Sequence, residues 1–207
     1  EKDFDTGPTT YSTTVYARDS GGRQDSQSLT FKLNDINDNS PIITSDSGNS
    51  ITRYFDENYS PNNVIYDVNA TDSDRSSNYN RVTYSLSNNS DFSINSSNGK
   101  VYFKAPKDFD TGPTSYSTTV YARDSGGRQD TQSLTFRLND TNDNSPIITS
   151  DSGRSVTRYF DENYSPNNVI YDVNATDSDR SSNYNQITYS LSNNSDFSIN
   201  SSNGKVY

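Results

Sequence analysis

The feature that most constrains the fold is an internal repeat. Residues 1–102 align with residues 106–207 at a constant offset of 105 positions, and only nine of the 102 aligned pairs differ. A period of this length is too long for most solenoid repeats and fits a series of separately folded domains. The same fold must therefore be built more than once, and we expect the array to be longer than these 207 residues.

Each copy contains the run Asp-x-Asn-Asp-Asn-Ser-Pro, at residues 35–41 and 140–146. It has no apolar face, Asp and Asn compete with a helical backbone for hydrogen bonds, and the Ser-Pro pair favours an extended chain. Its carboxylate and amide oxygens are the ligands that calcium prefers. We therefore interpret both runs as calcium-holding linkers. This predicts the end of one repeat at 1–39, a complete repeat at 40–144 and the start of the next at 145–207.

The composition excludes several classes of function. A net charge of −10 argues against nucleic acid as a partner. The absence of Cys and His removes the usual zinc ligands and the base of nucleophilic triads, so we expect no enzyme. No apolar run approaches the roughly 20 residues that span a membrane, and we expect no membrane contact in this stretch. Only 28% of residues are hydrophobic, which suggests disorder, but the apolar residues are patterned.

That pattern has a period of two, which indicates strands rather than helices. The turns Asn98-Gly99 and Gly126-Gly127 separate some of the alternating runs. Seven strands in roughly 100 residues are typical of an immunoglobulin-like β-sandwich. The inward-facing set is small, so stability is expected to depend on metal. The predicted strands cover residues 51–55, 64–70, 82–86, 92–94, 101–103, 116–122 and 134–138.

Five motifs in register resemble extracellular cadherin repeats. They are the linker run, Glu57-Asn58, Val-Asn-Ala-Thr-Asp-Ser-Asp at 68–74, Asp-Phe-Asp at 108–110, and Tyr-Ala-Arg-Asp-Ser-Gly at 121–126. The resemblance implies an all-β chain of tandem seven-stranded Greek-key β-sandwiches at the cell surface. It also implies about three Ca²⁺ ions at each junction. The implied function is a stiff spacer or calcium-dependent cell adhesion.

The resemblance also implies a ligand set. At the first junction it comprises the side chains of Asp3, Asp5, Asn37, Asp38, Asp72, Asp74 and Asp124 and the carbonyls of Ile36, Asn39 and Asn78. At the second junction it comprises Glu57, Asp108, Asp110, Asn142, Asp143, Asp177, Asp179 and Asn183 and the carbonyls of Thr141 and Asn144. Asp19 and Glu162, the counterparts of Asp124 and Glu57, are assigned to neighbouring junctions.

The charge balance fits this assignment. Six carboxylates stand at each junction and a seventh is expected outside the sequence, which gives −7 against the +6 of three divalent ions. One departure is that Asp5 and Asp110 stand where the family usually has Glu. Their shorter reach is expected to weaken binding. The chain has no Trp, so the family's N-terminal Trp exchange is not supported.

Two other functions remain open. One is a subunit of an extracellular structural filament, with other copies of the array packed head-to-tail or laterally. The other is a carbohydrate-binding surface module, in which outward tyrosines such as Tyr54, Tyr79 and Tyr102 stack on glycans. Glycosylation of the chain itself is also predicted. The acceptor sequons are at Asn58, Asn69, Asn88, Asn95, Asn139, Asn163, Asn174, Asn193 and Asn200.

Overall fold

The computed structural model describes residues 1–87, 90–192 and 195–207. Asn88 and Asn193, two of the predicted glycosylation acceptors, lie outside the described residues. The chain divides into two compact units, and each is described by itself. The first unit comprises Glu1–Arg53, Ser60–Pro106 and Ser115–Phe136, and the second comprises Tyr54–Tyr59, Lys107–Thr114 and Arg137–Tyr207. Among the described residues, no helix is long and apolar enough to cross a membrane.

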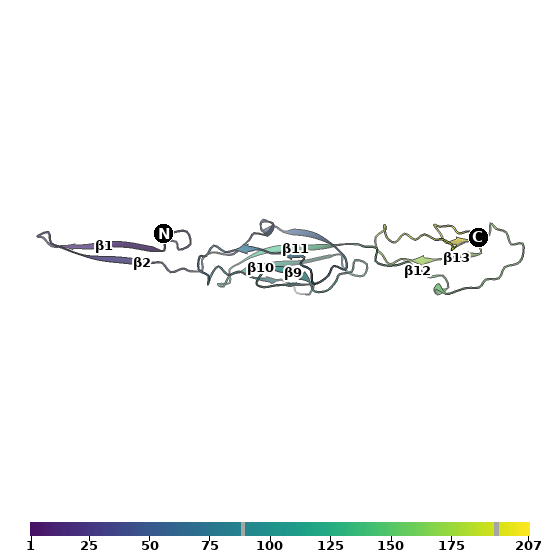
Figure 1. Ribbon diagram of the computed structural model, residues 1–207, viewed down its shortest axis with the longest axis horizontal. Coiled ribbons are helices and arrows are strands. Elements are labelled where there is room, and N and C mark those ends of the chain that lie inside the picture. Colours follow the sequence, from purple (N-terminus) through teal and green to yellow (C-terminus); the bar gives the residue numbers. More distant parts are fainter. Residues whose placement is uncertain (88–89, 193–194) are drawn as a thin grey trace. The chain divides into compact units, whose positions relative to one another are not determined.

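Residues 40–144 span one sequence period, which we call the central repeat, and contain three small sheets (Figure 1). A four-stranded sheet has the order β4-β11-β10-β7, a three-stranded sheet has the order β5-β9-β8, and β3 pairs with β6. A 3₁₀ turn, η1 (Ser45–Gly48), lies between β3 and β4. The strands are β3 (Ile42–Ile43), β4 (Ile51–Asp56), β5 (Tyr66–Asp67), β6 (Ala70–Thr71), β7 (Thr83–Leu86), β8 (Phe92–Ile94), β9 (Lys100–Phe103), β10 (Ser115–Arg123) and β11 (Gln129–Asn139).

The core of the central repeat is formed by alternate residues of its strands. Strand β11 buries Gln132, Leu134, Phe136 and Leu138, while the residues between them are more exposed. The ring centroids of Phe92 and Phe136 lie 5.3 Å apart, so residues from two different sheets meet in this core. The period-two pattern in the sequence thus corresponds to the buried faces of a β-sandwich.

Six of the seven predicted strands are confirmed as β4 and β7–β11, but the predicted strand at 64–70 is wrong as one element. Its two ends pair differently, β5 with β9 and β6 with β3. Between them, the Val68 N–H donates to the Gly99 carbonyl and the Asn69 carbonyl accepts from Thr44, so the chain changes sheets. The burial also differs, because Ile65 is buried and Val64 is exposed. The two-residue strand β3 was not predicted.

The predicted hairpin at Asn98-Gly99 is confirmed. Strands β8 and β9 are antiparallel, with Phe92 opposite Phe103. Gly99 has a φ of +71°, and a Cβ there would lie 2.1 Å from the Val68 carbonyl oxygen. Both the backbone conformation and the close approach therefore require glycine at this position.

The N-terminal hairpin consists of β1 (Thr10–Arg18) and β2 (Gln24–Lys32), which pair from Thr10↔Lys32 to Arg18↔Gln24 (Figure 1). These strands have nearly the sequence of β10 and β11, yet within the described residues they form a sheet of two strands only. Almost every residue of β1 and β2 is exposed.

The C-terminal segment, residues 145–207, repeats part of the central repeat. Strand β12 (Ile147–Ile148) pairs with β14 (Ala175–Thr176), and β13 (Tyr171–Asp172) pairs with β15 (Lys205–Val206). A 3₁₀ turn, η2 (Ser150–Gly153), follows β12. These pairings correspond to β3–β6 and β5–β9. The counterparts of β4 and β7, at 156–161 and 188–191, are all described and form no strand.

Candidate metal centre

The first linker brings together carboxylates that are far apart in the sequence. Asp5, Asp38 and Asp74 each offer an oxygen, and these oxygens lie within 4.8 Å of one another. Asp72, Asp74 and Asp124 form a second such group, so Asp74 belongs to both. The five residues come from the loop before β1, the linker, the segment after β6, and the end of β10. We call these five residues the first acidic cluster.

Local turns orient the members of this cluster. Asp72 Oδ1 accepts a hydrogen bond from the Asp74 N–H at 3.0 Å, and Asp124 Oδ1 accepts from the Arg128 N–H at 2.8 Å. Each carboxylate thus uses one oxygen to close its own turn. The other oxygen, Oδ2, of Asp72, Asp74 and Asp124 is buried without a hydrogen-bond partner. Three carboxylate oxygens therefore remain for a ligand.

Burial makes this arrangement costly without a cation. Asp74 is 2% exposed and Asp124 is 6% exposed. Burial raises the pKa of Asp72, and the neighbouring charges of Asp74, Asp124 and Asp5 raise it further. A buried carboxylate without a partner destabilises the fold unless a positive charge neutralises it. The cluster fits a cation with oxygen ligands.

Asn39 of the linker donates hydrogen bonds to three carboxylates of the first acidic cluster. Its side-chain Nδ2 lies 2.9 Å from Asp5 Oδ2, 2.8 Å from Asp74 Oδ1 and 3.2 Å from Asp38 Oδ1. Loss of solvent raises the pKa of Asp38, with further contributions from Asp5 and Asp74. The amide donor occupies the place toward which the three negative charges converge.

Asn37 is held by the turn between β10 and β11. Its carbonyl and its Oδ1 both accept hydrogen bonds from the Arg128 guanidinium, the latter at 2.7 Å. A Cβ at Gly126 would lie 2.8 Å from Asn37 Nδ2. Glycine at 126 therefore allows the close approach of the linker to this turn.

The second linker repeats the arrangement. Two groups of carboxylates again have ligand oxygens within 4.8 Å of one another, and they share Asp110. We call their members the second acidic cluster: Glu57, Asp110 and Asp143 in one group, and Asp110, Asp140 and Asp179 in the other.

Glu57 ties the second linker to the loop before β10. Its Oε2 accepts from the Phe109 N–H at 2.7 Å and its Oε1 from the Thr141 N–H at 2.9 Å. Loss of solvent raises the pKa of Asp143, and the charges of Glu57 and Asp110 raise it further by smaller amounts. The side chain of Asn144 donates to Asp110, Asp143 and Asp179 just as Asn39 does to their counterparts. Asp179 Oδ2 is buried without a hydrogen-bond partner, like Asp74 Oδ2.

Some predicted ligands lie outside these groups. Asp3 and Asp108 accept hydrogen bonds from the hydroxyls of Thr6 and Thr111, and these bonds lower their pKa. They order the loops that carry Asp5 and Asp110. The Asn78 carbonyl accepts from Ser125 Oγ at 2.7 Å. Within the described part of the chain, no acidic group includes any of the following predicted residues: Asp3, Asp19, Asp108, Glu162 and Asp177.

Asp140 is a member of the second cluster that the ligand prediction missed. Its Oδ2 accepts from the Ser181 N–H at 2.7 Å, and its Oδ1 is buried without a hydrogen-bond partner. Asp35 has the same two features at the first linker, with Ser76 as donor. Both are the first residue of the linker run, so their position in the motif was the available signal.

Comparisons with known proteins identify the family of the chain. Residues 51–139 match the cadherin domain model. Cadherin-23 of Mus musculus is 33% identical over 210 residues, covering 95% of this chain and 6% of the relative. The crystal structure of human CDH23 EC21-23 is 29% identical, with a TM-score of 0.74, over 96% of this chain and 63% of that chain. The protocadherin gammaB7 EC3-6 cis-dimer structure is 26% identical, with a TM-score of 0.69, over 99% and 51%.

The β-sandwich thus agrees with the structural relatives, and the sequence match covers most of its strands. The chain belongs to the cadherin family.

Proposed function

We propose that this chain is part of an extracellular, calcium-binding array of cadherin repeats that acts as a stiff spacer or in calcium-dependent adhesion. We also propose that the repeats meet at the two linkers, with residues 40–144 as one complete repeat. The chain spans 6% of the length of mouse Cadherin-23, so the function of the whole protein is part of this proposal.

The observation that carries the proposal is the recurrence of acidic groups with buried, unpartnered carboxylate oxygens at both linkers. When the linkers are compared at the offset of 105 residues, they supply three kinds of group. One contains the Glu57 position and one contains the Asp124 position. The remaining two groups share the Asp110 and Asp179 positions, which correspond to Asp5 and Asp74, and we count them as one kind. Three groups support about three ions per complete junction, because each group offers the oxygen ligands that Ca²⁺ prefers.

A mechanical role follows from where these ligands come. In the first cluster, Asp5 precedes the linker, Asp38 belongs to it, and Asp74 follows it. Bound calcium would supply the positive charge that offsets their mutual repulsion. With the charges neutralised, these carboxylates hold the segments before and after the linker in one arrangement. Without calcium, the repulsion between the carboxylates favours separation of the same segments.

Contact with other copies of the array is part of the proposed function. One similar structure is described as a cis-dimer of protocadherin gammaB7, which supports association between repeats of this family. The nine differences between the aligned copies leave most exposed positions identical, which favours repetitive contacts over recognition of one distinctive partner. We propose no catalytic role. Glycan binding through exposed tyrosines such as Tyr54 remains a prediction.

Isothermal titration of the chain with calcium tests the proposal. Wild-type chain is expected to bind several ions, and Asp74→Ala is expected to lose the ions of both groups that share Asp74. Asp38→Ala, which removes an exposed member of one group, is expected to lose fewer. Asp25→Ala removes an exposed carboxylate outside both clusters and serves as the matched control. An equal number of bound ions in wild type and Asp74→Ala would contradict the proposal, as would the absence of calcium binding.

A further inference from the structure

An arginine directly follows the Asp-Ser-Asp run at residues 72–74 and contacts the loop that carries Asp5. The Nη1 of this arginine, Arg75, donates to the carbonyls of Phe4 at 3.0 Å and of Gly7 at 3.3 Å. The guanidinium carbon also lies 5.9 Å from the centre of the Phe4 ring. A planar guanidinium has several N–H donors and an apolar face, so it can hold two carbonyls and a ring at the same time.

Arg180 makes the same contacts at the second linker. Its Nη1 donates to the carbonyls of Phe109 at 2.7 Å and of Gly112 at 3.3 Å, and its guanidinium carbon lies 5.6 Å from the centre of the Phe109 ring. The contacts of Arg75 lie within the first compact unit and those of Arg180 within the second. The arginine clamp therefore recurs in both units.

The loop that receives the guanidinium is a compact turn. The Gly7 N–H donates to the Asp3 carbonyl at 3.1 Å, and the Asp3 carboxylate accepts from the Asp5 N–H at 2.8 Å. A Cβ at Gly7 would lie 2.9 Å from the Asp3 carbonyl oxygen, so glycine permits this turn. Asp5 lies between Phe4 and Gly7 in the sequence. A clamp on the carbonyls of these two residues therefore also positions Asp5.

The Asp5 carboxylate is oriented by the backbone of the same arginine. Its Oδ1 accepts from the Arg75 N–H at 2.8 Å. Its Oδ2 lies 2.9 Å from Asn39 Nδ2, which also donates to Asp38 and Asp74. One oxygen of Asp5 is thus held by the segment after the linker, and the other belongs to the first acidic cluster.

Asp110 has the same pair of contacts. Its Oδ1 accepts from the Arg180 N–H at 2.7 Å, and its Oδ2 lies 2.7 Å from Asn144 Nδ2. Asp5 and Asp110 stand at the positions where the resemblance predicts the longer Glu. Because an Asp side chain is one methylene shorter, its backbone must lie closer to the cluster for the carboxylate to take part in it.

We propose that Arg75 and Arg180 are positioning residues that offset the short side chains of Asp5 and Asp110. Each guanidinium holds the loop before the linker against the segment after it, so that the shorter carboxylate joins the acidic cluster. This inference rests on the proposed function, because it concerns ligands of the calcium that the clusters are proposed to bind.

The charge of the arginines alone predicts the opposite effect. A positive charge beside an acidic cluster opposes the binding of another cation, so its removal should tighten calcium binding. If the arginines position the loops, their removal should weaken calcium binding instead. Residues that orient metal ligands typically contribute about tenfold or more to metal affinity. The sign of the change therefore distinguishes the two effects.

Isothermal titration with calcium compares wild type with the double variant Arg75→Ala/Arg180→Ala, in which neither junction keeps its clamp. We expect calcium to bind about tenfold more weakly to this variant. The matched control, Arg81→Gln/Arg154→Asn, also removes two positive charges, and each new residue is the one at the equivalent position of the other copy. We expect no weakening in the control. Unchanged or tighter binding in Arg75→Ala/Arg180→Ala would overturn the proposal.

A longer carboxylate tests whether the arginines act through reach. In the background Asp5→Glu/Asp110→Glu, the added methylene restores the reach of each side chain. The replacement of Arg75 and Arg180 by alanine is then expected to weaken calcium binding by less than about threefold, because the two changes are coupled. An equal loss of affinity in the Asp and Glu backgrounds would overturn the proposed compensation.

Amide hydrogen exchange in chelator tests the clamp without calcium. The Arg75 N–H donates to Asp5, so the protection of this amide reports whether the loop is in place. Exchange at positions 75 and 180, corrected for the change of side chain, is expected to accelerate in Arg75→Ala/Arg180→Ala. It should keep the wild-type rate in Arg81→Gln/Arg154→Asn. Unchanged protection at both positions in the alanine variant would overturn the clamp.

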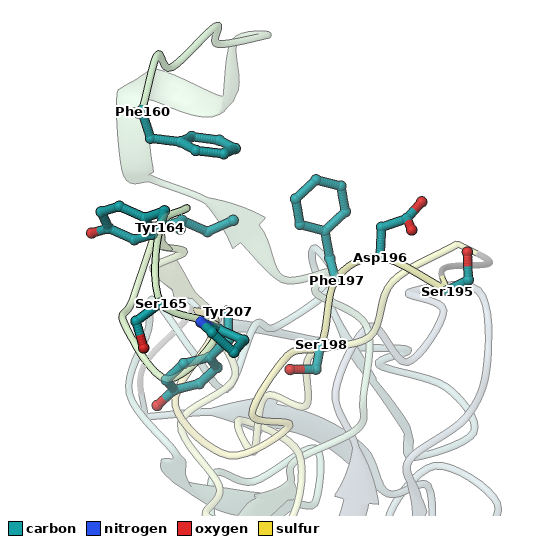
Figure 2. A pocket seen from close by; sticks show the side chains of 10 residues that line it. Phe160, Tyr164, Ser165, Ser195, Asp196, Phe197, Ser198 and Tyr207 are labelled. Atoms are coloured by element: carbon teal, nitrogen blue, oxygen red, sulfur yellow. The ribbon is translucent and has the colours of Figure 1, made fainter. Parts of the chain in front are cut away.

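Two single variants separate failure of this inference from failure of the proposed function. Asp110→Asn removes a carboxylate that both groups of the second acidic cluster share. Asp196→Asn removes one outside both clusters, on the lining of a pocket of about 360 Å³ toward which the rings of Phe160 and Phe197 point (Figure 2). Weaker calcium binding in Asp110→Asn alone supports the proposed function. Equal binding in wild type and both variants would contradict it, and amide exchange in chelator would still decide whether the arginines hold the loops.

Discussion

Residues 40–102 and 145–207 have almost the same sequence but different secondary structure. Residues 51–56 and 83–86 form β4 and β7 in the central repeat, whereas residues 156–161 and 188–191 are described and form no strand. In the central repeat both strands flank the hairpin β10–β11. Of the pairings that do not involve this hairpin, β3–β6 and β5–β9 are retained as β12–β14 and β13–β15. The third, β8–β9, has only the single bridge Ile199↔Val206 as its counterpart among the described residues.

This difference shows that β4 and β7 depend on a partner and not on their own composition. The strand-forming residues Tyr84 and Leu86 have identical counterparts at 189 and 191. A segment at the edge of a sheet gains its hydrogen bonds and its burial from the neighbouring strand, so it loses both when that strand is absent. The hairpin itself forms in either setting, because its turn and its cross-strand pairs are local.

The largest expected effect comes from a phenylalanine that is buried in one hairpin and exposed in the other. Phe136→Ala removes a fully buried ring and is expected to destabilise the central repeat by about 3–5 kcal/mol. Phe31→Ala changes the same residue in the N-terminal hairpin, where it is exposed, and is expected to change stability by less than about 0.5 kcal/mol.

Urea unfolding of both variants at high dilution measures this difference. Similar losses of stability in the two variants would mean that the hairpins are equally covered, which would break the comparison.

Removal of calcium is expected to destabilise the linkers more than the cores of the repeats. A ligand at 100 times its dissociation constant stabilises the folded state by about 2.7 kcal/mol, so chelation should remove a stabilisation of that order from the junctions. We expect limited proteolysis to accelerate at residues 35–41 and 140–146, while β10 and β11 remain resistant. Identical cleavage in calcium and in chelator would refute clamping by calcium.

Gly126 and Gly21 provide a sharper comparison of equivalent positions. Gly126→Ala would place a Cβ 2.8 Å from Asn37 Nδ2, whereas in Gly21→Ala the nearest contact is 3.4 Å, to Asp19 Oδ1. Overpacking of this kind costs about 1–3 kcal/mol. Gly126→Ala should therefore lower the thermal midpoint and weaken calcium binding at the first junction, and Gly21→Ala should change neither. Equal calcium titration curves for the two variants would count against the close contact with Asn37.

The smallest expected effect concerns Asp46 in η1. The hydroxyl of Tyr66 donates to Asp46 at 2.6 Å, and this bond, together with Arg53, lowers the pKa of Asp46 from its ordinary value. A lowered pKa in the folded state stabilises the fold above the pKa of the unfolded chain, and this stabilisation is lost as the pH falls through the folded pKa.

Wild-type chain should therefore lose more stability than Asp46→Asn between pH 5 and pH 3, and thermal unfolding over that range measures the difference. Asp151 forms the same bond with Tyr171 in the C-terminal segment, so Asp151→Asn is the matched variant. Parallel pH curves for wild type and Asp46→Asn would show that the bond does not contribute.

The sequence predicted most strands of the central repeat but not which of them recur in the C-terminal segment. Alternation identified the runs that became β7 and β11, because side-chain pattern reports which face is buried. It could not show that residues 188–191 would form no strand, because the pattern does not report whether a partner is available. The run at 64–70 failed for a related reason, since its alternation continues across the point where the chain changes sheets.

The sequence also predicted the candidate site only in part. Motifs identified Asp5, Asp38 and Asp74, which are 69 residues apart at their extremes, and the structure brings them together. Whether they hold calcium stays a prediction. Asp140 was missed because the ligand set implied by the resemblance begins at Thr141 in this linker, whereas the fold brings the side chain of Asp140 close to Asp110 and Asp179.

The most direct test of calcium binding is a crystal structure of the chain grown in calcium, with anomalous scattering recorded to locate the ions. We expect anomalous density between Asp5, Asp38 and Asp74 and between Asp72, Asp74 and Asp124. The side chain of Asn39 is then expected to turn its amide nitrogen away from the ion. A folded chain in calcium without density at either group would contradict the central claim.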